Sequence, residues 1–246
     1  MKYPVNVHYF DVVDSYSKAY ILGFIAADGA LVKGTSTSSV SLTITVKYED
    51  RAVLYFIKNQ LQDVNRKLLE IRRKNSFDKT KEIHHIRYTI SKRPIINALR
   101  KYGITENKSL SMDNILYNIP IEYRNAFIIG YFDGDGSVSI LDKEKPNDKG
   151  YLCKDYSMYI SIRGTQKFLE GICGHLSIDK SHIKQYDSIP RLAFASKKDT
   201  VQFFNCYNNL TFYYKRKHDK FLQRMNHPSY DKYKQVQTIS SPTEYL

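Results

Sequence analysis

Two stretches of this 246-residue chain decide its fold. The first reads YILGFIAADG and spans Tyr20–Gly29, and the second reads FIIGYFDGDG and spans Phe127–Gly136. Both carry apolar residues around a central glycine and end in Asp-Gly, and they lie 107 positions apart. Self-similarity at this spacing indicates that the chain contains two copies of one structural unit.

The sequence after each stretch continues the repeat. Alternating residues predict a strand over Ser41–Val46 and another over Ser157–Ile162, and a helical pattern follows each of them. A second strand ending in Ser-Lys and a further helix then follow in both halves. Each half therefore reads αββαββα, which is an α+β unit with an antiparallel sheet of about four strands. We expect an N-terminal half over 1–118, a C-terminal half over 119–225 and a loose C-terminal extension over 226–246.

The repeated stretches are expected to form helices that pack together at the centre of the molecule. Small residues recur along them, notably Gly23 in the first copy and Gly130 in the second. Small residues on one helix face let two backbones approach closely. The halves differ mainly over 142–156, which reads as a turn-rich insertion between two strands of the second half.

Each expected helix ends in an aspartate, Asp28 or Asp135, followed by glycine. An acid at a helix C-terminus meets the partial negative charge of the free carbonyls, and two such acids side by side repel each other. A divalent cation would offset both effects, because carboxylate and carbonyl oxygens are the ligands that Mg²⁺ prefers. The alternative is that each Asp-Gly only ends a helix and starts a turn. The duplication favours the metal-binding interpretation.

The chain has a surplus of basic residues, with 38 Lys and Arg against 25 Asp and Glu, a formal net charge of +13. This surplus indicates a polyanionic partner, with nucleic acid the first candidate and an anionic membrane the second. Residues 1–123 carry 19 basic and 12 acidic side chains, a net +7, and residues 124–246 carry 19 and 13, a net +6. The even division suggests that both halves contact the partner. No apolar run approaches the ~20 residues of a membrane helix, and the three cysteines lack the spacing of a zinc site.

On these two motif copies, ILGFIAADG and IIGYFDGDG, the sequence resembles the single-chain, two-motif LAGLIDADG homing endonucleases. The resemblance implies a pseudo-twofold monomer with two saddle-shaped antiparallel sheets that lie along the major groove of double-stranded DNA. It implies that Asp28 and Asp135, helped by the carbonyls of Ala27 and Gly134, hold Mg²⁺, for which Mn²⁺ can substitute. A metal-activated water would then attack each scissile phosphorus in line, leaving short 3′ overhangs on a long, partly asymmetric target.

The resemblance also implies a basic catalytic residue near the end of each repeat. Lys108 and Lys217 occupy these places, 80 positions after Asp28 and 82 after Asp135. Each would orient the water network or stabilise the transition state, and the alternative for both is a solvated surface lysine. One departure from the motif is Ala26, which stands where the second copy has Asp133. The polar pocket residue that the family often has after the second strand stays unassigned.

The candidate DNA contacts are basic residues on the expected strands, where strands can read base edges or neutralise phosphates. They are Lys47, Arg72, Arg73, Lys74, Arg87, Arg163, Lys184 and Arg191. For any one of them the alternative is a solvated charge. The lysines of the 142–156 insertion would extend the footprint over the DNA flank.

Three functions are compatible with this pattern. The first is a site-specific endonuclease that acts in intron homing, as part of a mobile genetic element. The second is an RNA maturase of the same fold that binds intron RNA, and the third is a DNA-binding regulator that does not cut. The presence of both Asp28 and Asp135 favours the nuclease. A protein-splicing element is not expected, because the printed sequence lacks the terminal nucleophile and Asn. We expect an intracellular protein that resides with DNA, in a bacterial or phage-infected cytoplasm or an organelle matrix.

Overall fold

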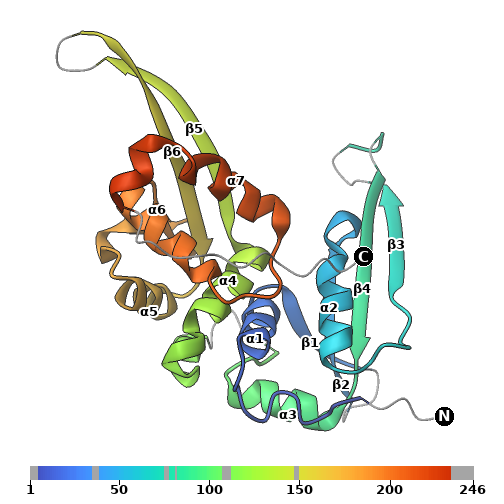
Figure 1. Ribbon diagram of the computed structural model, residues 1–246. Coiled ribbons are helices and arrows are strands. Elements are labelled where there is room, and N and C mark those ends of the chain that lie inside the picture. Colours follow the sequence, from blue (N-terminus) through green and yellow to red (C-terminus); the bar gives the residue numbers. More distant parts are fainter. Residues whose placement is uncertain are drawn as a thin grey trace.

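The computed structural model describes residues 5–34, 39–74, 78–80, 82–106, 112–146 and 150–233. Two halves share the element order αββαββα, which confirms the predicted duplication, and the second half adds one further helix (Figure 1). The elements of the first half are α1 (Tyr16–Asp28), β1 (Gly29–Lys33), β2 (Val40–Lys47), α2 (Ala52–Gln60), β3 (Leu69–Lys74), β4 (Glu82–Ile90) and α3 (Arg93–Lys101). Those of the second half are α4 (Arg124–Asp135), β5 (Ser137–Pro146), β6 (Leu152–Arg163), α5 (Gln166–Leu176), β7 (Ile183–Tyr186), β8 (Ile189–Phe194), α6 (Lys197–Phe204) and α7 (Lys215–Met225).

Each half contains a four-stranded antiparallel sheet, in the order β1-β2-β4-β3 or β5-β6-β8-β7. Alternate residues of β2, Leu42, Ile44 and Val46, are buried under the helices, whereas Thr43 and Thr45 between them are only partly covered. This period-two alternation means that one face of the sheet packs on the core and the other is open. We call the side opposite the helices the open face of each sheet.

Helices α1 and α4 pack against each other at the centre of the molecule (Figure 1). A Cβ atom added to Gly23 would lie 2.1 Å from the Phe127 carbonyl oxygen, and one added to Gly130 would lie 2.0 Å from the Tyr20 carbonyl oxygen. The two backbones therefore cross in direct contact, which only glycine permits at these positions. The predicted role of the small residues is confirmed.

Local hydrogen bonds fix where α1 begins and where both central helices end. Ser15 begins α1 as its N-cap, because its hydroxyl accepts a hydrogen bond from the Lys18 amide. The Gly29 amide donates to the Ile25 carbonyl, and the chain continues from Gly29 directly into β1. Gly136 closes α4 in the same way before β5. Both aspartates consequently lie where a helix meets the first strand of its sheet.

Two sequence-based expectations about the second half need correction. Residues 142–156 are not mainly loop, since Asp142–Pro146 pairs with Leu152–Tyr156 and lengthens the β5–β6 hairpin. Figure 1 shows this hairpin extending well beyond the helices of its half. The start of the expected C-terminal extension is not loose either, because Pro228–Tyr233 forms a 3-10 helix with Tyr230 fully buried. Residues 234–246 lie outside the described residues. No described helix is long and apolar enough to cross a membrane.

Candidate active site and nucleic-acid interface

The two aspartates of the repeated motif are brought together at the ends of α1 and α4. A Cβ atom added to Gly134 would lie 3.3 Å from the Asp28 carboxyl carbon and 2.4 Å from the Ala27 side chain. The residue before Asp135 therefore lies against Asp28. Both carboxylates also interact electrostatically with the Tyr131 hydroxyl. Burial is the largest cause that raises the pKa of Tyr131, and the charges of Asp135 and Asp28 raise it further. Asp135 is exposed and Asp28 is partly exposed, so both are open to a ligand.

These donors suit a hard divalent cation. Carboxylates and the last carbonyls of two helices supply oxygen ligands, and the C-terminal ends of both helix dipoles add negative potential. In the described part of the chain no group of three or more His, Cys, Asp or Glu side chains could enclose a metal ion. Mg²⁺ fits such a partial site, because it is commonly bound by one or two carboxylates and retains water or takes substrate phosphate oxygens.

Lys217 lies beneath the end of α4 rather than on the surface. It is 5% exposed, and its ammonium donates to the carbonyl oxygens of Phe132 at 2.5 Å, Asp133 at 2.9 Å and Gly136 at 2.7 Å. Burial lowers the pKa of Lys217 to about 8, against the opposing attraction of Asp133. Lys217 thus caps the helix that carries Asp135, and the alternative of a solvated lysine is wrong. Lys108, its expected counterpart, lies outside the described residues.

The carboxylate of Asp133 has a structural role, because it holds neighbouring elements together through hydrogen bonds. Its Oδ2 accepts hydrogen bonds of 2.7 Å from the Tyr20 hydroxyl on α1 and of 2.7 Å from the Tyr214 amide at the start of α7. Burial raises the pKa of Asp133 to about 6, while the nearby charge of Lys217 acts in the opposite direction. Asp133 therefore joins both central helices to α7, and at the matching place in the first copy stands the buried Ala26.

An ion pair that the sequence did not reveal joins the two halves. The guanidinium of Arg216 on α7 donates from Nε and a terminal nitrogen to the two oxygens of Asp50, each at 2.8 Å. Asp50 ends the 3-10 turn Tyr48–Asp50 that follows β2, which is the region where the family-based polar pocket residue stayed unassigned. The two residues are 166 positions apart, so no local spacing could have indicated the pair.

The open face of the second sheet gathers three predicted contact residues. Arg191 lies directly opposite Arg163 on β6 and directly opposite Lys184 on β7. The guanidinium of Arg191 stacks over the Tyr186 ring at 4.1 Å from its centre, and that of Arg163 lies 5.5 Å from the same ring. Like charges in direct cross-strand register destabilise a sheet unless an anion neutralises them. This arrangement matches a phosphate-bearing ligand.

The open face of the first sheet holds only part of its predicted set. Lys47 lies opposite His85, and Arg87 lies opposite Thr45, whose hydroxyl it contacts at 3.1 Å. Arg73 shares this face by alternation along β3. Arg72 and Lys74 occupy the alternate positions and point to the other side of β3, so the structure does not join them to the open face.

Comparison with known proteins identifies the architecture. The fold is shared with the homing endonuclease I-WcaI bound to its DNA recognition sequence, at a TM-score of 0.54 and 17% identity over 80% of this chain and 84% of that chain. It is also shared with the LAGLIDADG meganuclease I-AabMI bound to uncleaved DNA, at a TM-score of 0.51 and 10% identity over 83% and 88% of the two chains. The chain therefore has the LAGLIDADG homing-endonuclease fold, which confirms the resemblance and the fold class.

Sequence comparison adds two proteins of which the chain covers only a small part. No protein-family model matches the chain. It is 24% identical over 200 residues to a DNA polymerase of Acanthamoeba polyphaga mimivirus, covering 80% of this chain and 11% of that protein. It is 31% identical over 87 residues to a reverse gyrase of Thermococcus kodakarensis, covering 35% of this chain and 5% of that protein. The chain thus spans about a tenth or less of the curated relatives that it matches.

Proposed function

We propose that this chain is a site-specific DNA endonuclease that cuts both strands of a long, partly asymmetric target. One observation carries the proposal: two aspartates meet at the ends of the crossed helices α1 and α4, beside sheets whose open faces carry cations. The relatives of this fold that are bound to DNA support it. The proposal includes a monomer, because one chain already supplies both halves and both acids, and it places the protein with DNA inside the cell.

The residues of the chain have separate tasks in this reaction. Asp28 and Asp135, with the carbonyls of Ala27 and Gly134, would hold Mg²⁺, or Mn²⁺ in its place. Bound there, such a cation polarises a phosphate oxygen and lowers the pKa of a bound water. Arg163 and Arg191, which lie opposite each other in the second sheet, neutralise phosphates of the DNA backbone and orient the DNA strand. Lys217 holds the last turn of α4 and so fixes the position of Asp135.

The asymmetry between the halves shapes the target. Among the described residues, β5 pairs with β6 from Ser137 to Pro146, whereas β1 pairs with β2 from Gly29 to Lys33. At about 3.4 Å per residue the longer hairpin reaches roughly 17 Å further. We therefore propose a longer half-site on the side of the C-terminal half, and 3′ overhangs from cleavage across the minor groove.

The experiment is cleavage of a library of long randomised duplexes in Mg²⁺, followed by sequencing of both product ends. The proposal expects a single enriched target of unequal half-sites with short 3′ overhangs. Tight binding to one target without any cut, in Mg²⁺ or Mn²⁺, would instead indicate a regulator of this fold. Failure to bind duplex DNA at low salt would rule out both.

A further inference from the structure

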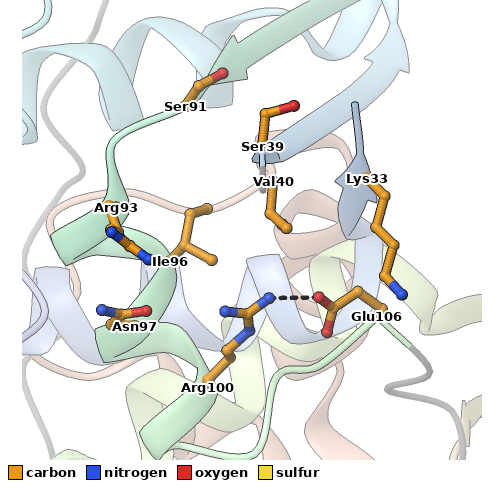
Figure 2. Close-up of a pocket in the computed structure, with 9 residues that line it drawn as sticks. All are labelled: Lys33, Ser39, Val40, Ser91, Arg93, Ile96, Asn97, Arg100 and Glu106. Atoms are coloured by element: carbon orange, nitrogen blue, oxygen red, sulfur yellow. Dashed lines mark hydrogen bonds and ion pairs between the residues drawn. The ribbon is translucent and has the colours of Figure 1, made fainter. Parts of the chain in front are cut away.

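A separate cavity of about 720 Å³ lies at the edge of the first half, within the volume range of small-ligand sites. Figure 2 shows α3 on one side of it and the ends of β1 and β2 on the other. Its polar and charged lining comes from Lys33, Ser39, Ser91, Arg93, Asn97, Arg100 and Glu106.

This cavity lies on the helix side of the sheet. Leu31 of β1 and Leu42 of β2 are buried in the core. Lys33 comes two positions after Leu31, and Val40 comes two positions before Leu42. Both therefore lie on the same side of the sheet as these leucines. The remaining wall comes from α3, which packs on that side. The cavity is therefore distinct from the open face that carries Arg87.

The charge of the cavity is unbalanced. It holds three cations, Lys33, Arg93 and Arg100, against the single anion Glu106, a net +2. Arg100 pairs with Glu106, and this hydrogen bond first of all lowers the pKa of Glu106, so the carboxylate stays ionised. Within the described residues neither Lys33 nor Arg93 forms an ion pair. Arg93 also stands in the first turn of α3, where the helix dipole is positive and no acidic residue is present.

The chemistry of the lining selects a phosphate group. The cations Lys33 and Arg93 lie on opposite walls of the cavity (Figure 2). The hydroxyls of Ser39 and Ser91 and the amide of Asn97 line it with them, so the cavity offers both charged and neutral donors. Val40, which is partly exposed, adds an apolar contact, and the cavity is larger than an inorganic phosphate needs. A nucleotide fits both features, because its phosphate can meet the cations while its sugar or base covers Val40.

We propose that this cavity binds the phosphate of a nucleotide, as a second nucleic-acid contact on the face opposite the DNA-reading sheet. The strand that leaves the open face, or a separate single strand, would supply it. The inference does not depend on cleavage, because neither Lys33 nor Arg93 belongs to the proposed active site. A protein that cuts DNA but lacks this contact would show cleavage without binding at the cavity. A protein that has the contact but does not cut would show binding at the cavity without cleavage.

The test is protection of lysines from acetylation, read by mass spectrometry on the full chain. The probes are inorganic phosphate, AMP, adenosine and a 12-nucleotide single strand with blocked ends. We expect the strand, AMP and phosphate to protect Lys33 while adenosine does not. Lys101, which lies on α3 outside the cavity and is exposed, serves as the internal control. Protection by AMP alone would assign the site to a free nucleotide and overturn the nucleic-acid contact.

Variants give a second, independent measurement. We expect Arg93→Ala to weaken binding of the 12-nucleotide strand about tenfold, the usual effect of losing one charge-assisted hydrogen bond. Lys101→Ala should leave that binding within twofold, and both variants should cut or bind a short duplex like the unaltered chain. Equal protection of Lys33 and Lys101, or equal effects of the two substitutions, would overturn the proposal.

Discussion

Substituting Gly130 by alanine tests whether the crossing of α1 and α4 is held by direct backbone contact. The added Cβ would lie 2.0 Å from the Tyr20 carbonyl oxygen and 3.0 Å from the Phe24 amide nitrogen. An ordinary carbon-oxygen contact is about 3.3 Å, so the helices must separate by about 1 Å. Backbone atoms cannot rotate away as a flexible side chain could. The strain should therefore reach the upper range for overpacking, about 3 kcal/mol.

The net effect is smaller because alanine favours helix by about 1 kcal/mol over glycine. We expect Gly130→Ala to lower the free energy of unfolding by about 2 kcal/mol, which lowers Tm by about 4–8 °C in a protein of this size. Gly174→Ala is the matched control, since Gly174 lies in α5 and its added Cβ meets nothing within 4 Å. That variant should gain up to about 1 kcal/mol. Equal Tm changes in differential scanning calorimetry would refute the close crossing.

Three further experiments, with four substitutions, probe the centre of the molecule. Burial lowers the pKa of His218 to about 4, so the native state binds fewer protons than the unfolded state between about pH 6.5 and 4 and loses stability as the pH falls through that window. His218→Phe should remove about 3 kcal/mol of this loss, seen as a flatter dependence of Tm on pH, and an unchanged slope would contradict it. Arg216→Ala and Asp50→Asn should show a coupling of about 1 kcal/mol in a double-mutant cycle of urea unfolding, whereas additive effects would mean that the pair does not join the halves. Tyr20→Phe should cost about 1–3 kcal/mol because it removes a donor from the buried Asp133 carboxylate, and a neutral result in the same assay would show that water replaces the hydroxyl.

Local sequence patterns predicted the architecture well. The alternation over Ser41–Val46 predicted β2, and Thr165 caps the helix that its pattern predicted. These elements depend on side-chain periodicity and capping, which neighbouring residues determine. The pattern over 142–156 misled because lysines and turn-forming residues, although depleted in strands, do not prevent the pairing of Asp142–Pro146 with Leu152–Tyr156.

The candidate site was predictable only where the repeat itself carried it. The duplication identified Asp28 and Asp135 and placed them at helix ends. It could not show that Lys217 is buried under α4, because a run of basic residues is usually solvated. Nor could it separate Arg72 from Arg73, since a shift of one position in a strand changes the face. The Asp50–Arg216 pair and the cavity beside α3 depend on tertiary packing alone.

The most direct test of the central claim is the single-turnover cleavage rate of the selected target in Mg²⁺. Asp28→Asn and Asp135→Asn are compared with Glu122→Gln, a change at an exposed acid in the 3-10 turn just before the opposite end of α4. The account predicts that each aspartate variant binds the target and loses at least about a hundredfold in rate, about 2.7 kcal/mol of transition-state stabilisation. Glu122→Gln should cut normally. Full cleavage by either aspartate variant would contradict the proposal that these two acids form the active site.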